Sequence, residues 1–212
     1  MLKNQKLKML LASIITLIPI PIGLLIWDKL PDQIATHWDF AGNPNGWSSK
    51  EFAVIGMPLF LLFVHWICVA GTKADPKAAS HPKQLMALLY WSCPAVSIFC
   101  MGSTYAEALG YHVSITHFGA ILVGISFMII GNYLPKCPHN YTMGIRIPWT
   151  LHSEENWNRT HRFAGPIWVI FGILFPLLTF LGYPKLCTAL MFIAVFVPII
   201  YSYLDFKKYE SK

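Results

Sequence analysis

Six long apolar runs constrain the fold of this chain more than any other feature of its 212 residues. Each run holds roughly the 17 to 25 residues that a helix needs to cross a hydrocarbon core about 30 Å thick. None contains Asp, Glu, Lys or Arg, and none shows the polar stripe of a soluble core helix. The sequence therefore predicts an all-α, polytopic membrane protein with six transmembrane helices. The predicted spans cover residues 9–27, 53–70, 85–106, 115–133, 163–182 and 186–204.

The first run also resembles a secretory signal peptide, because Lys3, Lys6 and Lys8 precede it. Its apolar part is longer than the usual signal-peptide core, however. Asp28 and Lys29 follow it, where a signal peptide would show small residues around a cleavage site. We interpret the run as an uncleaved first span.

The Lys and Arg residues predict the orientation of the six spans. With both termini on the cytoplasmic side, the inner segments hold 13 of the 16 Lys and Arg residues and the outer loops hold 3. This bias follows the positive-inside rule, and a reading with five or seven spans would remove it. We expect the net charge of +6 to meet the anionic headgroups of the lipid bilayer, so we predict no direct contact with nucleic acid.

The first outer loop, residues 28–52, is short but rich in aromatic and turn-forming residues. Trp38 and Trp47 flank a turn signal centred on Pro44. The loop carries four acidic residues and two lysines, and this negative net charge suits the binding of a cationic or amphipathic molecule. The alternative is that the tryptophans form an ordinary interfacial belt.

The segment between the fourth and fifth spans, residues 134–162, is the most polar part of the predicted cytoplasmic face. It contains all three arginines of the chain, Arg146, Arg159 and Arg162, together with two of its eight tryptophans. Clustered arginines suit bidentate recognition of phosphate or carboxylate, whereas lysine would serve equally well as a simple positive anchor. Both a recognition site and an anchor remain open from the residues alone.

A helix is predicted to begin just before this segment ends and to run directly into the fifth span. Ser153 is a good N-cap, and Glu155 lies in the first turn, where the helix dipole favours negative charge. At 100° per residue, Glu155 and Arg159 share one face as an i,i+4 pair, while Trp157 lies on the opposite face. The helix therefore enters the membrane as an amphipathic segment.

Other residues carry weaker signals. The five cysteines contain no C-x-x-C pair, and Cys137 with His139 would supply only two metal ligands, so we predict no metal or cofactor. His65 lies inside the second span, and we expect its ring to be packed and bonded to a neighbouring carbonyl. The inner loops show no nucleophile–base pair, and we therefore predict that the protein is not an enzyme.

Five sequence motifs together resemble the SdpI family and the small domain of unknown function that precedes it in many members. The family motifs are GNYLPK at 131–136, NYTMGIRIPWTL at 140–151 and WNRTHRFAG at 157–165. Two further motifs, LPDQIATHWD at 30–39 and GWSSK at 46–50, resemble the preceding domain. The order of the motifs and the six-span frame agree as well. We accordingly divide the chain into residues 1–70, with the outer loop, and an SdpI-like region at 71–212.

The resemblance implies a multi-pass immunity protein of the bacterial cytoplasmic membrane. Such a protein protects its producer from a secreted peptide toxin that collapses membrane energetics. It also signals by drawing an ArsR-type repressor to the membrane when the toxin is present. Two other classes remain: a lipid-headgroup-binding protein or transporter that uses the arginine loop, and a structural membrane protein with neither role. An ion-coupled transporter is disfavoured because no predicted span contains an acidic residue.

Seventeen residues in the two polar segments are the candidate binding residues. In the outer loop they are His37, Trp38, Gly46, Trp47 and Lys50, and in the inner segment and its flanks Asn132, Asn140, Gly144, Arg146, Pro148, Trp149, Thr150, Trp157, Arg159, Thr160, His161 and Arg162.

Overall fold

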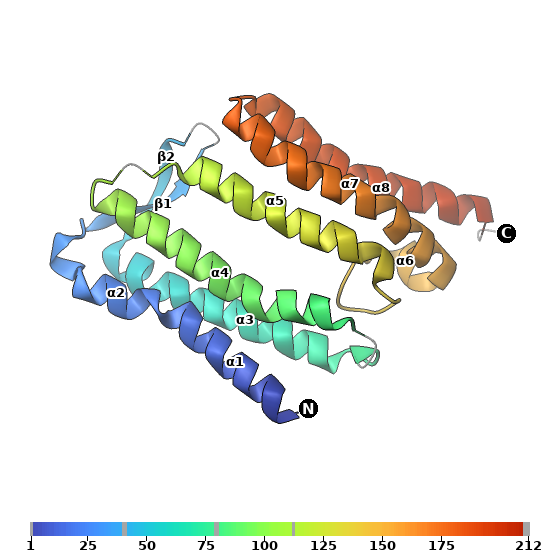
Figure 1. Cartoon of the computed structure of the whole chain (residues 1–212), viewed down its shortest axis with the longest axis horizontal. Coiled ribbons are helices and arrows are strands. Elements are labelled where there is room, and N and C mark those ends of the chain that lie inside the picture. Colours follow the sequence, from blue (N-terminus) through green and yellow to red (C-terminus); the bar gives the residue numbers. More distant parts are fainter. Residues whose placement is uncertain (1, 40–41, 79–80, 112, 210–212) are drawn as a thin grey trace. The chain divides into compact units, whose positions relative to one another are not determined.

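The computed structural model describes residues 2–39, 42–78, 81–111 and 113–209. Within these residues, six helices are long and apolar enough to cross a membrane, which confirms the predicted all-α polytopic fold (Figure 1). The candidate spans are Gln5–Leu25, Phe52–Ala74, Lys83–Ala108, Ile115–Lys136, Glu154–Phe180 and Pro184–Tyr209. The cytoplasmic placement of both termini stays a prediction.

Several of the spans combine more than one helical element. The first comprises α1 (Leu2–Leu17) and α2 (Pro19–Leu25), and the second a π-helical turn (Phe52–Gly56) followed by α3 (Met57–Ala74). The remaining spans are α4 (Lys83–Ala108), α5 (Ile115–Tyr133) with a 3₁₀ turn (Leu134–Lys136), α7 (Glu154–Phe180) and α8 (Pro184–Tyr209). The short helix α6 (Pro148–His152) precedes α7, and a 3₁₀ turn (Trp27–Lys29) follows α2.

The first span breaks between α1 and α2, as its prolines predict. Pro19 lacks the N–H that would continue the hydrogen-bond ladder of α1, and Pro21 removes a second donor two residues later. Two side chains of α4 bond backbone carbonyls next to the break. The Ser97 hydroxyl donates to the Thr16 carbonyl at 2.7 Å, and the Tyr105 hydroxyl donates to the Pro19 carbonyl at 3.0 Å. These partners allow irregular backbone within an apolar helix.

The outer loop folds into a β-hairpin, which the sequence analysis did not predict. β1 (Gln33–Trp38) pairs antiparallel with β2 (Pro44–Ser49), and the pairing is irregular around His37. Ile34 lies opposite Ser48, and Ala35 lies opposite Trp47. Neither strand alternates clearly between apolar and polar residues, so the period-2 signal of a half-buried strand is absent from the sequence.

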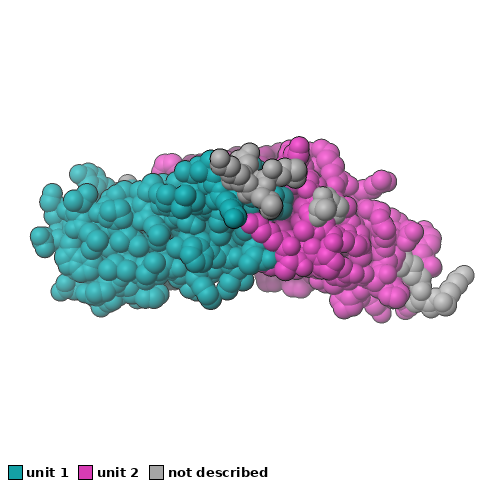
Figure 2. Space-filling view, turned by 90° about the horizontal axis from the view of Figure 1, so that it is seen from below, with its two compact units in different colours: residues 1–70, 86–116 teal, residues 71–85, 117–212 magenta. Residues whose placement is uncertain are grey.

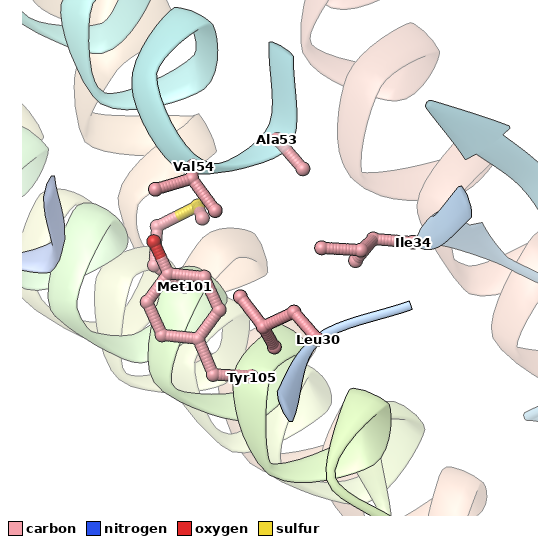
Figure 3. Packing of buried hydrophobic residues seen from close by; sticks show 6 residues of the cluster. All are labelled: Leu30, Ile34, Ala53, Val54, Met101 and Tyr105. Carbon is pink, nitrogen blue, oxygen red and sulfur yellow. The ribbon is translucent and has the colours of Figure 1, made fainter. Parts of the chain in front are cut away.

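The hairpin is anchored by one buried side chain. Ile34 is 1% exposed and packs into a cluster formed by Leu30, Ala53, Val54, Met101 and Tyr105 (Figure 3). These residues come from the loop before β1, from the start of the second span and from α4. The close packing extends to α2, where a Cβ on Gly23 would lie 2.6 Å from the Tyr105 hydroxyl oxygen.

The chain forms two compact units (Figure 2). Unit 1 contains residues 1–70 and 86–116, including the hairpin, and unit 2 contains residues 71–85 and 117–212. The division into residues 1–70 and 71–212 was drawn from the sequence motifs, and it remains a prediction. In the structure, most of α4 belongs to the compact unit formed by the N-terminal residues.

Within unit 2, glycines bring α5 and α7 into close contact. A Cβ on Gly124 would lie 2.5 Å from the Gly172 carbonyl oxygen, and a Cβ on Gly131 would lie 2.7 Å from the Gly165 carbonyl oxygen. The two pairs lie seven residues apart on each antiparallel helix, so both sit on the same interface. Such small-residue contacts replace the hydrophobic effect as the source of helix association in lipid.

His65 departs from its expected environment. Its side chain is fully buried in α3, but neither ring nitrogen has a hydrogen-bond partner among the described residues. The expected bond to a neighbouring carbonyl is therefore not formed.

Candidate functional site

Asn140 organises the polar segment between α5 and α6. Its side chain is fully buried, and its amide nitrogen donates to the carbonyls of Pro138 and Met143 at 2.8 and 2.9 Å. Its amide oxygen accepts from the N–H groups of Thr142 and Met143 at 2.9 and 2.7 Å. One side chain thus replaces the backbone ladder that this irregular segment lacks. The segment is an ordered turn rather than a solvated tether.

Asp75, just after α3, ties the preceding inner loop to this turn. Its carboxylate accepts from the Tyr141 N–H at 2.9 Å, the Thr142 hydroxyl at 2.8 Å and the Lys77 N–H at 2.8 Å. Burial alone would raise the pKa of Asp75, but these hydrogen bonds outweigh it and lower the pKa below its ordinary value. The buried His81 ring lies 3.5 Å from the same carboxylate.

A second contact between the two inner loops is made by Lys77. Its ammonium group donates to Nδ1 of His139 at 2.6 Å, and the other ring nitrogen of His139 lies 3.1 Å from the Leu151 carbonyl. The His139 ring is therefore the tautomer that carries its proton on Nε2. The turn is bonded to the α3–α4 connector on one side and to α6 on the other.

Gly144, His161 and Trp157 form the tightest part of the segment. Gly144 has a φ of +118°, and a Cβ there would lie 2.5 Å from Nε2 of His161 and 2.9 Å from the Trp157 ring. The Ile145 N–H donates to Nε2 of His161 at 3.0 Å, while Nδ1 of His161 donates to the Trp157 carbonyl at 2.8 Å. This arrangement requires a neutral His161 with its proton on Nδ1. Both the backbone angle and the lack of space for a Cβ explain why glycine occupies position 144.

The Trp157 side chain packs against this part of the segment. It is fully buried, its indole N–H donates to the Cys137 carbonyl at 2.9 Å, and its ring stacks on His161 with centroids 4.0 Å apart. The amphipathic pattern of the helix predicted this inward face, and Arg162 is exposed on the other.

Arg146 and Thr150 shape the entry to α6. The exposed Arg146 donates from Nη1 to the Tyr141 carbonyl at 2.8 Å, so part of its guanidinium group holds the turn. The buried Thr150 hydroxyl accepts from the Ile147 N–H at 3.1 Å and bonds the Ile145 carbonyl at 2.7 Å. Pro148 is the exposed first residue of α6. Trp149 follows it and packs edge-on against Tyr203 of α8, with ring centroids 5.3 Å apart.

Arg159 is engaged by α8. Its Nε lies 2.8 and 2.9 Å from the two carboxylate oxygens of Asp205, a partner that the sequence did not indicate. Asn156 joins the same cluster, because its amide donates to Asp205 at 2.8 Å and to the Ser202 carbonyl at 2.9 Å. Ser153 caps α7 by accepting from the Asn156 N–H at 3.1 Å, as predicted. We call Asn156, Arg159, Ser202 and Asp205 the α7–α8 clasp.

The remaining inner candidates are not brought into this cluster by any contact that the structure shows. Asn132, near the end of α5, is exposed. Thr160 is fully buried, but its hydroxyl has no hydrogen-bond partner among the described residues. Of the three arginines, Arg146 and Arg162 are exposed, while Arg159 is directed at a carboxylate of the same chain.

The outer candidates all belong to the hairpin or its end. Lys50 lies inward: its ammonium group donates to the Leu30 carbonyl at 3.0 Å and sits 5.2 Å from the centre of the Trp27 ring. His37 bonds the Asn45 side chain, and Gly46 lies opposite it, where a Cβ would be 3.0 Å from the Cβ of His37. Trp38 is half-buried, whereas Trp47 is 58% exposed.

Comparison with known proteins identifies two matching parts of the chain, one containing the polar segment between α5 and α7 and one containing the hairpin. Residues 136–202 match the model of the SdpI/YfhL protein family, and residues 14–62 match a domain of unknown function, DUF1648. These two matches confirm the resemblance to the SdpI family and to its preceding domain that the motifs predicted. It is 26% identical over 206 residues to the immunity protein SdpI of Bacillus subtilis (strain 168), which covers 97% of each chain. No solved structure matches it.

The SdpI-family region contains most of the inner cluster but not all of its partners. The match begins at Lys136 and ends at Ser202, so Asp75 and Asp205 lie outside it. The sequence analysis singled out neither of these two acids. The available signal was composition: each is a lone acid at the end of an apolar run, in a chain with only ten acidic residues.

The geometry of the SdpI-family region favours presentation of a rigid surface over chemistry. Its buried polar groups are bonded mainly to each other, and the Cys137 thiol has its pKa raised by burial, which makes it a poor nucleophile. Of the candidate binding residues in this region, Gly144, Arg146, Pro148 and Arg162 are exposed. This arrangement can offer cationic contacts from a fixed backbone.

Proposed function

We propose that this protein is an immunity protein of the bacterial cytoplasmic membrane, which protects its cell against a secreted, membrane-active peptide. The observation that carries the proposal is the similarity to an immunity protein over 97% of both chains, including the hairpin and the inner segment. The proposal places the hairpin on the outer face, where the peptide arrives. It assigns no enzymatic activity to the protein.

The second half of the proposal concerns signalling. We infer that the inner segment holds an ArsR-type repressor at the membrane when the peptide is present, and so removes it from its operator. Support comes from the exposed Arg146 and Arg162 beside a backbone that Asn140 and Asp75 keep in one conformation. A preorganised surface loses little entropy when a partner binds.

Protection can be tested in a Bacillus subtilis strain that lacks its own immunity protein and receives peptide secreted by a producer strain. We expect cells that express this protein to survive and to keep their membrane potential, measured with a potential-sensitive dye. The B. subtilis immunity protein serves as the positive control and an empty vector as the negative one. Loss of potential at the vector's rate, with the protein present in the membrane at normal abundance, would overturn the proposal.

Signalling has its own readout in the same cells. A fluorescent ArsR-type repressor should move from the nucleoid to the membrane after peptide addition, and an Arg146→Lys variant should recruit less of it, because lysine cannot reproduce the guanidinium fork. Protection without any repressor movement would refute signalling and leave immunity standing.

A lipid-headgroup site is the second candidate function, favoured by the exposure of Arg146 and Arg162. It is weakened by Arg159, whose Nε is directed at Asp205. Purified protein in nanodiscs should gain thermal stability in phosphatidylglycerol relative to phosphatidylcholine if this site exists, and Arg146→Ala should remove the gain. Equal stability in both lipids excludes the site.

A further inference from the structure

The hairpin of unit 1 has two strands only, among the residues that the structure describes. In an antiparallel pair, alternate backbone N–H and C=O groups of each strand point away from the partner strand. Such an edge is a template on which a further extended chain can be added. A bonding surface for backbone therefore exists on the hairpin, independent of its side chains.

The exposed strand of the two is β2. Four of its six residues are exposed, whereas β1 contains the buried Ile34 that anchors the hairpin to the core. β2 also begins with Pro44, and proline is tolerated in sheets mainly on edge strands. Of the two outer edges of the hairpin, that of β2 is therefore the more accessible to an added strand.

Trp47 stands beside this edge. It lies opposite Ala35, on the face away from the anchoring pair of Ile34 and Ser48, and it is 58% exposed. An exposed indole next to a strand edge supplies a large apolar contact for alternate side chains of an added strand. Recognition by backbone and by one aromatic side chain can therefore occur at the same place.

The charged residues near the β2 edge indicate which kind of peptide could bind there. Residues 28–52 hold four acids and two lysines, in a protein whose net charge is +6. Lys50 lies inward, with a side chain that is 12% exposed, and its ammonium group lies 3.5 Å from a carboxylate oxygen of Asp32, whose side chain is 99% exposed. Asp28 and Glu51 are exposed as well, and Lys29 is the exposed cation of the loop. The accessible charge at this end of unit 1 is consequently acidic.

We propose that the edge of β2 captures an extended, cationic segment of the membrane-active peptide by adding it to the hairpin as a third strand. In this mode the backbone of β2 supplies the hydrogen bonds, Trp47 contacts apolar side chains on one face, and the exposed acids attract lysine or arginine on the other. This inference rests on the proposed immunity function and specifies how its ligand is recognised.

The test uses the full-length protein in nanodiscs and a synthetic eight-residue peptide of alternating lysine and valine as the probe. Two further peptides carry backbone N-methyl groups, one on the lysines and one on the valines. A strand that is bonded along one edge uses the N–H groups of one alternate set only. We therefore expect one methylated peptide to bind at least about tenfold more weakly than the parent and the other to bind like the parent.

Variants of the protein locate the contact. Trp47→Ala should weaken binding of the parent peptide about tenfold, and Asp32→Asn should weaken it in a salt-dependent way. The matched control is Trp66→Ala, which removes another half-exposed tryptophan of unit 1, on α3, and should change nothing.

Three results would overturn the inference. Equal binding of all three peptides would show that no backbone edge is used, and equal loss with both methylated forms would show a contact that is not one-edged. Equal effects of Trp47→Ala and Trp66→Ala would show adsorption to the lipid. If the protein protects cells but the probe behaves in any of these ways, the immunity function stands and strand addition fails. If the probe binds as expected but cells are not protected, the immunity function fails alone.

Discussion

Gly144 is the residue at which backbone angle and packing both demand glycine. Its φ of +118° lies in a region that residues with a side chain disfavour. A Cβ at this position would lie only 2.5 Å from Nε2 of His161, so the close approach of the ring requires glycine. The bond from the Ile145 N–H to His161 depends on this close approach. The position therefore couples the turn to α7.

We expect Gly144→Ala to destabilise the protein by about 3 kcal/mol, because strain and steric overlap add. Gly110→Ala is the matched control: it has a φ of +86° but no neighbouring atom within 4 Å, so only the backbone strain of about 1 kcal/mol remains. Thermal unfolding in detergent measures both. Similar melting temperatures for the two variants would contradict the role of His161 and Trp157.

The hydrogen bonds between the two inner loops depend on the ionisation state of Asp75. Its pKa is lowered in the folded protein, since hydrogen bonds from Lys77, Tyr141 and Thr142 stabilise the carboxylate more than burial penalises it. A lowered pKa means that the carboxylate contributes stability above the ordinary value of 3.8 and that this contribution disappears as the pH falls through the folded pKa.

We therefore expect Asp75→Asn to be less stable than the parent at about pH 6, and the difference to shrink as the pH falls below about 4 and through the folded pKa, below which both carry a neutral group. Denaturant unfolding in detergent across this range provides the measurement. A difference that stays constant with pH would mean that the variant disturbs packing rather than charge.

At the scale of elements, the α7–α8 clasp joins two long neighbouring helices, α7 with 27 residues and α8 with 26. The clasp lies at one end of the pair, where Arg159 and Asn156 meet Asp205. Charge alone does not make this contact, because the guanidinium Nε is placed between both carboxylate oxygens.

We expect Arg159→Lys to destabilise the protein by about 2 kcal/mol, although it keeps the positive charge. Asp205→Asn should have a similar effect, and the double variant should cost less than the sum, because the two residues form one interaction. Arg162→Lys, an exposed position on the same helix, is the control and should be neutral. Additive effects in this cycle would show that the clasp does not couple the residues.

At the scale of the whole molecule, the orientation predicted from the Lys and Arg bias decides which polar segment faces the outside. The structure identifies Pro44 in β2 and Asn158 in α7 as exposed positions for labelling, whereas Ser153 is a buried cap. These exposed positions allow the topology to be tested by labelling.

In a background without the five native cysteines, an impermeant maleimide should label Pro44→Cys in intact cells and Asn158→Cys only after the membrane is opened. Equal membrane abundance of the two variants is the control. Labelling of Asn158→Cys in intact cells would place the inner segment outside and reverse the assignment of both surfaces.

Local signals in the sequence determined much of this protein. Apolar runs of membrane-spanning length predicted six helices, because an unbonded backbone cannot cross lipid. Ser153 predicted the start of α7, and Pro19 determines the break in the first span, since each acts through its own backbone or its nearest neighbours.

Only the tertiary structure decided which distant residues meet. The clasp joins residues 46 positions apart, and the bond from Thr142 to Asp75 spans 67 positions. The hairpin was missed for a related reason: its strands are stabilised by pairing with each other and by the burial of Ile34 against α4, not by their own pattern. Such contacts depend on how helices pack in three dimensions. Hydrophobic length reports that a helix crosses the membrane, but not which face of it meets which neighbour.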